Sequence, residues 1–208
     1  MVKNVIDVYC VKCDVLKNNN RRVEYKKKQS EIAKKLIYYM INKKNPIYNK
    51  ENLSIQIGKY GKPYIDHFFF NVAHSGDWVV GAIANNNIGI DIEKHKKRDF
   101  DICKSFFSKN EQKYIITCSD VFKGFYDVWV AKESYMKAIG MGFYKDMISF
   151  ELDFLYENWR VSSNNKYVIQ SIDIDPSYSC AVCSIDKTMG VITYLEINEV
   201  EGCCDSLL

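Results

Sequence analysis

Carboxylates alternate with isoleucines in residues 88–93, which read Ile-Gly-Ile-Asp-Ile-Glu. Successive side chains of a strand point to opposite faces, so this pattern predicts one apolar face and a second face that carries Asp91 and Glu93. Two carboxylates at this spacing, beside a glycine that leaves room for close approach, suit a hard divalent cation such as Mg²⁺. A solvated strand face has the same composition and, for this stretch alone, is the commoner explanation.

A second group of chemically capable residues lies in residues 129–142, which predict a helix that ends at glycines. Glu133 and Lys137 are four residues apart and therefore share a helix face. One interpretation is a surface ion pair worth about 0.2–0.5 kcal/mol. The other is a metal-binding or basic carboxylate beside a lysine that stabilises a phosphate during transfer. The pair alone leaves both interpretations open.

Two shorter stretches contribute nitrogen groups that suit anions. His74 lies among small residues in Asn-Val-Ala-His-Ser-Gly, where a ligand can approach the backbone, and Lys62 lies between turn-forming residues in Gly-Lys-Pro. A single histidine is more often a structural residue than a ligand, and a loop lysine is often simply exposed. Neither residue indicates a function by itself.

In this order and at these separations, the stretches resemble the Sfp-type 4′-phosphopantetheinyl transferases. The resemblance implies an enzyme of the holo-[acyl-carrier-protein] synthase type, which transfers 4′-phosphopantetheine from coenzyme A to a serine of an apo peptidyl or acyl carrier protein. The transfer releases 3′,5′-ADP and gives the holo carrier used in fatty-acid, polyketide or nonribosomal peptide synthesis. The motifs that carry the resemblance are GKP at 61–63, FNVAHSGDWVVG at 70–81, IGIDIE at 88–93, FFSKNE at 106–111 and WVAKESYMKAIGMG at 129–142.

The resemblance implies that three carboxylates hold the metal. Asp91, Glu93 and Glu133 match the family's Mg²⁺ ligands, with Mn²⁺ as an alternative ion. Glu133 is also the expected base for the carrier serine, acting directly or through a water. Lys137 is expected to stabilise the departing phosphate.

Contacts to coenzyme A are implied for five further residues. The family's motif places Lys62 and His74 at the phosphates and Pro63 beside the adenine, and Lys27 and Lys28 are candidates for the lysines that hold the 3′-phosphate. One departure is that Ala73 stands where the family commonly has serine. We therefore expect weaker binding of coenzyme A and unchanged transfer chemistry.

The resemblance predicts an α+β fold of two pseudo-symmetric halves, each a small antiparallel sheet packed against helices, with the ligand in the cleft between them. We expect the halves to be residues 1–86, with the coenzyme A contacts, and residues 87–208, with the metal and transfer residues. The segment 100–107 matches the family's carrier contact, with Ile102 and Phe106 as candidate apolar contacts. The periodicity predicts helices over 29–42, 100–107, 109–116 and 121–139 and strands over 2–11, 53–57, 149–156, 167–172, 179–185 and 191–197, with 78–84 and 88–93 as a hairpin around three asparagines.

Charge is distributed unevenly along the chain. Residues 1–70 hold 15 Lys+Arg and 6 Asp+Glu, a net of +9, which leaves 14 against 20, a net of −6, for the remainder. A basic half beside an acidic half suits a polyanion held by lysines near a metal. A nucleic-acid-binding module or a solvated lysine-rich surface explains the lysines as well, but neither needs the three carboxylates. A family member that binds coenzyme A and has lost the transfer activity is a further alternative.

The composition is that of an ordinary globular chain, with 208 residues and 47% hydrophobic residues. The longest uncharged stretch, 78–90, is shorter than the roughly 18 apolar residues that suggest a membrane span. We therefore predict a cytoplasmic protein, and fusion of both halves in one chain predicts a monomer. The pairs CVKC at 10–13 and CAVC at 180–183 lie in predicted strands, where residues three apart face opposite ways, so we expect buried thiols and not a shared zinc ion.

Overall fold

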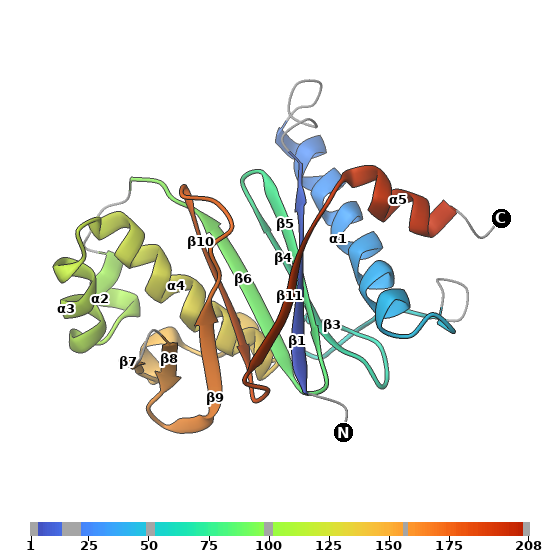
Figure 1. The fold of residues 1–208 in the computed structure, drawn as a ribbon. Coiled ribbons are helices and arrows are strands. Elements are labelled where there is room, and N and C mark those ends of the chain that lie inside the picture. Colours follow the sequence, from blue (N-terminus) through green and yellow to red (C-terminus); the bar gives the residue numbers. More distant parts are fainter. Residues whose placement is uncertain (1–3, 14–21, 49–52, 98–101, 156–157, 206–208) are drawn as a thin grey trace.

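The computed structural model describes residues 4–13, 22–48, 53–97, 102–155 and 158–205. Two sheets lie side by side, and each has one long helix on its outer flank (Figure 1). This arrangement confirms the predicted α+β class with two sheet-and-helix halves. Among the described residues, none of the helices combines the length and hydropathy needed to cross a bilayer.

The first sheet has the strand order β11-β1-β5-β4 and carries helices α1 and α5 on one face. The strand β11, from near the C-terminus, runs parallel to β1, with Val8 opposite Ile192. The sheet is therefore mixed, and the last strand of the chain joins the first half. The predicted boundary between residues 86 and 87 stays a prediction. The elements are β1 (Val5–Lys12), α1 (Arg22–Lys44), β4 (Phe69–Ser75), β5 (Trp78–Ala84), β11 (Thr188–Leu195) and α5 (Ile197–Asp205), and a separate two-stranded ribbon is formed by β2 (Gln56–Ile57) and β3 (Pro63–Tyr64).

The second sheet is antiparallel throughout, with the order β6-β10-β9-β8-β7, and helix α4 packs on it. Asp120 caps α4 by accepting hydrogen bonds from the backbone N–H groups of Phe122 and Lys123. Gly140 follows the helix with φ of 74°, a left-handed conformation that favours glycine. The elements are β6 (Ile88–Lys94), α2 (Ile102–Phe106), α3 (Lys109–Thr117), α4 (Val121–Ala138), β7 (Leu152–Leu155), β8 (Asn158–Val161), β9 (Asn164–Ser171) and β10 (Tyr178–Ser184), with two 3₁₀ turns at Gly142–Tyr144 and Met147–Ser149.

The predicted hairpin of 78–84 with 88–93 is wrong. β5 pairs with β1 and β4, whereas β6 pairs with β10, so the asparagines at 85–87 carry the chain from one sheet to the other. The hairpin partner of β5 is β4, joined to it by Gly76 and Asp77, with Gly76 at φ of 57°. A two-residue turn with positive φ at its first central position matches the strand twist, and this explains why the chain turns here.

Three clusters of buried residues form the core. One lies between α1 and the first sheet, one between α4 and the second sheet, and the third between the two sheets. Ile88, Ile90 and Ile92 belong to the third cluster and are fully buried, which confirms the predicted apolar face of 88–93. Cys10 and Cys13 fall in different clusters, as the predicted strand requires, and so do Cys180 and Cys183.

Candidate active site

A cavity of about 610 Å³ lies where α1, β4, β6 and α4 come together. β4 and β6 are edge strands of the two sheets, and the backbone N–H of Ile90 donates to Asn71 Oδ1 at 2.9 Å, which joins the two edges. The cavity therefore lies on the seam between the halves. The residues that the sequence singled out and that line it are Pro63, His74, Asp91, Glu93, Glu133 and Lys137.

The alternation of residues 88–93 brings Gly89, Asp91 and Glu93 to the face of β6 that meets α4. A Cβ atom on Gly89 would collide with the backbone of Ser134 and Ala138 in that helix. The missing side chain therefore lets α4 pack directly on the strand. This close contact brings Glu133 of the helix to the same cavity as the two strand carboxylates.

Replacing Gly89 by alanine tests this close contact. We expect Gly89→Ala to lower the free energy of unfolding by about 1–3 kcal/mol, because helix backbone must move to admit the methyl group. The measurement is urea unfolding followed by circular dichroism. Gly202→Ala in α5, where no atom lies within 4 Å of the added carbon, is the matched control and should gain up to about 1 kcal/mol. Equal effects of the two changes would contradict a tight contact at Gly89.

Some carboxylate oxygens of the cavity have a hydrogen-bonding or ion-pair partner and others have none. Lys137 Nζ lies 2.6 Å from Asp91 Oδ1 and donates to the carbonyl oxygen of Ile90 at 3.2 Å. Glu93 Oε2 accepts a hydrogen bond from Ser75 Oγ at 2.8 Å. Asp91 Oδ2 and Glu133 Oε1 are buried and have no hydrogen-bond partner. Two acceptors that have lost water without gaining a donor are costly, and such a pair calls for an explanation.

Burial and mutual repulsion make these carboxylates reluctant to ionise. Burial raises the pKa of Asp91 to about 6, although the charge of Lys137 opposes the rise. Burial and the charge of Asp91 raise the pKa of Glu133 to about 7. Burial lowers the pKa of Lys137, but the carboxylates of Asp91 and Glu133 outweigh it, so that the net shift is upward. A bound cation would favour the ionised forms of both carboxylates and so lower their pKa values.

The donor set fits a hard divalent cation. In the described part of the chain, no three His, Cys, Asp or Glu side chains are close enough together to hold an ion. Asp91 forms an ion pair with Lys137 instead. Oxygen is nevertheless the ligand that Mg²⁺ prefers, and two carboxylate oxygens from two elements are buried without partners. Asp91, Glu93 and Glu133 are the carboxylates of this cavity that such an ion would use, and their side chains would have to move closer together to bind it.

The basic wall of the cavity comes from α1 and β4. His74 faces the cavity from β4, and its pKa is lowered by burial and by the charges of Lys137 and Lys26. Ser30 and Lys34 of α1 also line the cavity. Ser30 and Lys34 were not predicted as site residues from the sequence. The four-residue spacing of Lys26, Ser30 and Lys34 does indicate that the three share a helix face.

Of the two lysines predicted to hold the 3′-phosphate, Lys27 shares the helix face of Ser30 and Lys34, and Lys28 does not. Lys27 and Lys28 are exposed, and neither lines the cavity. Lys28 falls on the opposite side of the helix from Ser30, because each residue advances about 100° around the axis. Their contact with a ligand stays a prediction, whereas Lys34 of the same helix lines the cavity.

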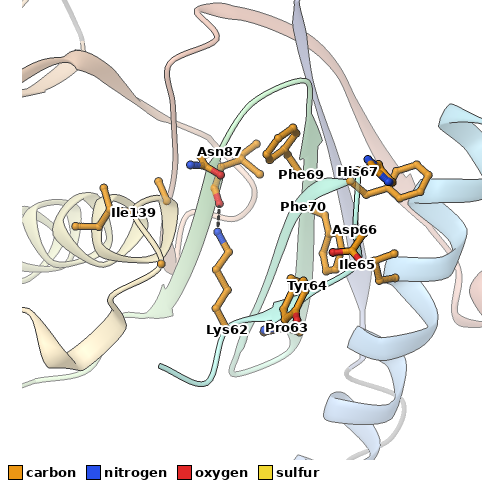
Figure 2. A pocket seen from close by; sticks show the side chains of 14 residues that line it. Lys62, Pro63, Tyr64, Ile65, Asp66, His67, Phe69, Phe70, Asn87 and Ile139 are labelled. Carbon is orange, nitrogen blue, oxygen red and sulfur yellow. Dashed lines mark hydrogen bonds between the residues drawn. The ribbon is translucent and has the colours of Figure 1, made fainter. Parts of the chain in front are cut away.

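The ammonium of Lys62 contacts backbone oxygens, and its predicted contact with coenzyme A stays a prediction. Its ammonium donates to the carbonyl oxygens of Ile88 at 2.8 Å and of Lys137 at 2.7 Å. Figure 2 shows the side chain directed toward the backbone beside Asn87. Lys62 does not line the 610 Å³ cavity but lines two smaller ones, of about 300 and 230 Å³, and the 230 Å³ cavity shares Pro63, Glu133 and Lys137 with the large one.

The buried amine of Lys62 should make stability depend on pH. Burial lowers the pKa of Lys62 to about 8 from 10.5. The unfolded chain therefore holds this proton more tightly than the folded chain does, and the contribution of Lys62 to stability increases as pH rises from about 8 to 10.5. We expect the free energy of unfolding of wild type, minus that of Lys62→Met, to become more positive between pH 7.5 and pH 9.5 in urea titrations. A difference that shrinks with rising pH would contradict this assignment.

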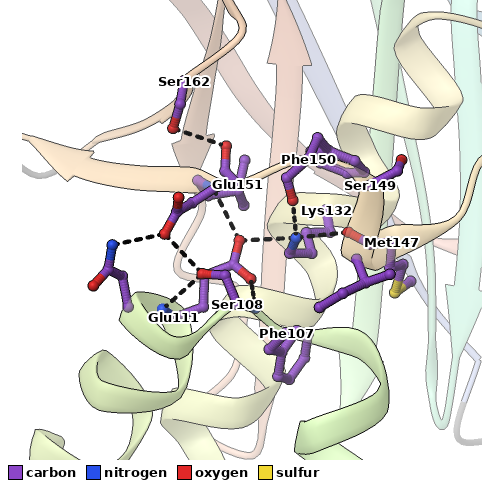
Figure 3. A network of polar contacts seen from close by, with 12 residues as sticks. Phe107, Ser108, Glu111, Lys132, Met147, Ser149, Phe150, Glu151 and Ser162 are labelled. Atoms are coloured by element: carbon purple, nitrogen blue, oxygen red, sulfur yellow. Dashed lines mark hydrogen bonds and ion pairs between the residues drawn. The ribbon is translucent and has the colours of Figure 1, made fainter.

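A buried ion pair holds α4 in place behind the site (Figure 3). Lys132 Nζ lies 2.8 Å from Glu111 Oε1, and both side chains are fully buried. The same ammonium donates to the carbonyl oxygens of Met147 at 2.8 Å and Phe150 at 2.6 Å. Glu111 in turn accepts from the backbone N–H of Ser108 at 2.8 Å, which completes a capping box at the start of α3. Because Lys132 precedes Glu133, this network fixes the rotation of the helix that carries Glu133.

The predicted carrier-contact segment is partly described. α2 covers Ile102–Phe106, and residues 100 and 101 lie outside the described residues, as does the side chain of Ile102. Phe106 is half-buried and its ring packs edge-on against Trp129, with centroids 5.4 Å apart. Contact of this segment with a carrier stays a prediction.

Comparison with known proteins places the chain in a family. A family model described as the 4′-phosphopantetheinyl transferase superfamily matches residues 87–183. The 4′-phosphopantetheinyl transferase gsp of Aneurinibacillus migulanus is 34% identical over 158 residues, which cover 72% of this chain and 67% of that protein. The chain belongs to the Sfp-type 4′-phosphopantetheinyl transferases. The family resemblance found in the sequence is thereby confirmed.

Other family members show similar agreement. The 4′-phosphopantetheinyl transferase Sfp of Bacillus subtilis (strain 168) is 35% identical over 146 residues, 65% of each protein. The chain thus spans about two thirds of the length of these curated relatives. A solved structure, the holo-[acyl-carrier-protein] synthase of Thermotoga maritima, has a TM-score of 0.41 and 13% identity, and the alignment covers 47% of this chain and 61% of that one.

Proposed function

We propose that this chain transfers 4′-phosphopantetheine from coenzyme A to a serine hydroxyl of an apo carrier protein. The observation that carries the proposal is the pair of buried, unpartnered carboxylate oxygens on Asp91 and Glu133, at a cavity that also holds His74 and Lys137. Family membership supports the reaction type. The carrier class, peptidyl or acyl, and the finer assignment to the holo-[acyl-carrier-protein] synthase type are part of the proposal.

The metal belongs to the proposal as well. Asp91, Glu93 and Glu133 would hold Mg²⁺, with Mn²⁺ as the alternative. When bound, such an ion neutralises charge on the transferred phosphoryl group and orients the diphosphate of coenzyme A. Ser75 restrains Glu93 through the 2.8 Å hydrogen bond to Oε2, so one proposed ligand is oriented in advance.

In the proposed transfer step, residues of this chain accept the proton and stabilise the leaving group. The carrier serine Oγ forms a bond to the phosphorus next to pantetheine, the bond from that phosphorus to the oxygen of 3′,5′-ADP breaks, and the serine proton goes to Glu133 directly or through a water. Lys137 stabilises the negative charge that develops on the leaving phosphate.

The basic wall would bind the remaining phosphates of coenzyme A. His74 and Lys34 face the cavity from two different elements, and an anion between them favours the charged form of the imidazole. Pro63 at the rim offers an apolar surface for the adenine. Lys27 and Lys28 stay candidates for binding the 3′-phosphate of coenzyme A.

The alanine at position 73 offers a test of ligand placement. Ala73 lines the cavity and is buried, on the face of β4 opposite to His74, so Ala73→Ser would add a hydroxyl where the cavity meets the seam between the two sheets. We expect this change to tighten binding of 3′,5′-ADP by about 2- to 10-fold, which corresponds to one added hydrogen bond. Isothermal titration calorimetry checks it. Weaker binding by Ala73→Ser would show that the phosphates of the ligand do not lie beside residue 73.

A fluorescent coenzyme A analogue tests the proposed function. The protein is incubated with Mg²⁺, the analogue and an apo carrier, and with the same carrier after its acceptor serine has been replaced by alanine. We expect a fluorescent band for the first carrier alone on a denaturing gel. Labelling of the serine-to-alanine carrier would overturn the proposal. So would the absence of labelling when several peptidyl and acyl carriers have been tried.

The proposed partners and location follow the same reasoning. We infer that the chain acts as a monomer in the cytoplasm on carrier proteins and that it needs neither nucleic acid nor a membrane. Both halves of the site come from one chain, which supports a monomer. Light scattering that shows a stable trimer would contradict this proposal.

A further inference from the structure

The ammonium of Lys62 bridges the two elements that carry the candidate metal ligands. It comes from the loop between β2 and β3 and donates to one carbonyl oxygen on β6 and one on α4. Ile88 begins β6, three residues before Asp91, and Lys137 lies in the last turn of α4, one turn after Glu133. The position of Lys62 therefore affects both elements at once.

The two acceptors are suited to a cation. A carbonyl in the last turn of a helix lies at the negative end of the helix dipole, where a positive charge is favoured. Burying an ammonium is costly unless its protons are used, and here two of them are donated at 2.8 and 2.7 Å. Lys59, in the same loop, is exposed. The burial of Lys62 is therefore specific to its place in the loop.

The strand has no side chain of its own at this crossing. Gly89, next to Ile88, faces α4 with bare backbone, because a Cβ there would meet Ser134 and Ala138. Close backbone packing of this kind excludes the interlocking side chains that normally set the position of a helix on a sheet. The bridge from Lys62 supplies a second polar connection at this crossing, beside the ion pair of Lys137 with Asp91.

We infer that Lys62 is a positioning residue that holds the start of β6 against the last turn of α4, and that it is not a ligand of the coenzyme A phosphates. The catalytic consequence rests on the proposed function, because it concerns the relative placement of Asp91 and Glu133. The connection between the two elements does not depend on that function. These two parts can be tested separately.

The first test needs no activity. Hydrogen exchange is measured on the full chain, without metal or ligand, for wild type, Lys62→Met and the control Lys59→Met. We expect amides in segments 88–93 and 135–141 to exchange about tenfold faster or more in Lys62→Met, because local opening there becomes easier. Lys59→Met should match wild type. Unchanged exchange in Lys62→Met would overturn the inference.

The second test separates positioning from phosphate binding. If Lys62 positions the carboxylates, Lys62→Met should bind 3′,5′-ADP within about threefold of wild type, while kcat falls by about tenfold or more and KM for coenzyme A changes little. If Lys62 is a phosphate ligand, the 3′,5′-ADP affinity should fall by about tenfold or more with kcat retained, and that result would also overturn the inference.

Two further outcomes are decided in advance. Should Lys62→Met fail to fold, Lys62→Gln, which has an uncharged amide on a shorter side chain, is compared in the same way. Faster exchange in the same two segments supports the inference, and unchanged exchange overturns it. Should wild type transfer nothing to any carrier, the proposed function fails, while the exchange experiment still decides whether Lys62 connects β6 to α4.

Discussion

Asp91→Asn should reduce metal-dependent transfer by at least about 100-fold. The substitution keeps the size of the side chain and removes the charge that both Lys137, at 2.6 Å from Oδ1, and a bound cation would use. It also replaces one carboxylate oxygen, either the unpartnered Oδ2 or the Oδ1 that pairs with Lys137, by an amide nitrogen that repels a cation. The measurement is kcat/KM for coenzyme A at saturating carrier over a range of Mg²⁺ concentrations.

The control for this prediction is Asp153→Asn on β7. Asp153 is exposed and lies outside the cavity, so its neutralisation should leave turnover unchanged. If Asp91 served only to pair with Lys137, Asp91→Asn would alter stability and keep normal turnover at high Mg²⁺. Such a result would remove Asp91 from the proposed metal site.

Lys132→Met should lower the free energy of unfolding by about 3–5 kcal/mol, because it leaves the buried carboxylate of Glu111 without its cation. The change also frees the carbonyl oxygens of Met147 and Phe150, which the ammonium now holds. Urea unfolding followed by tryptophan fluorescence measures the loss. Since α4 would lose its attachment to the segment before β7, turnover should fall as well.

Lys123→Met on the same helix is the matched control. Lys123 pairs with Asp127 at 2.7 Å, four residues along α4, but its side chain is 51% exposed. An exposed pair contributes at most about 1 kcal/mol. If the two lysines gave equal losses, the Lys132–Glu111 pair would not be a buried anchor of α4. Should Lys132→Met be too unstable to purify, Glu111→Gln tests the same pair with a smaller change.

The local elements were largely predictable because their signals lie within a few residues. The period of two in 88–93 gave the correct faces of β6, with the isoleucines inside and the carboxylates on the cavity. The helix predicted over 121–139 is observed as Val121–Ala138, bounded by Asp120 and Gly140. Caps and alternation are properties of the nearby sequence, and for this reason they could be read directly.

The pairing of distant segments was not predictable in the same way. The parallel pairing of β11 with β1 joins residues about 180 positions apart, and no local pattern encodes such a contact. The three asparagines at 85–87 have the composition of a hairpin turn but connect two sheets. A turn-forming composition tells where the chain bends and not which strands then pair.

The site residues likewise divide into those that a local motif predicted and those whose position depends on the packing of distant elements. The family resemblance predicted Asp91, Glu93, Glu133, Lys137 and His74, and all five line one cavity. Which lysine of a helix faces a cavity depends on how that helix packs, so Lys34 was missed and Lys28 was named instead. The position of Lys62 was not predictable either, since its acceptors are backbone carbonyls of two remote elements.

The most direct test of the proposed function is the intact mass of an apo carrier protein after incubation with this protein, coenzyme A and Mg²⁺, with parallel reactions that contain EDTA or Asp91→Asn. We predict a gain of one phosphopantetheine on the carrier with wild type and Mg²⁺, and no gain in the two parallel reactions. An unchanged carrier mass across several peptidyl and acyl carriers, with coenzyme A binding confirmed by calorimetry, would contradict the proposed transfer. A gain that persists in EDTA would contradict the metal site.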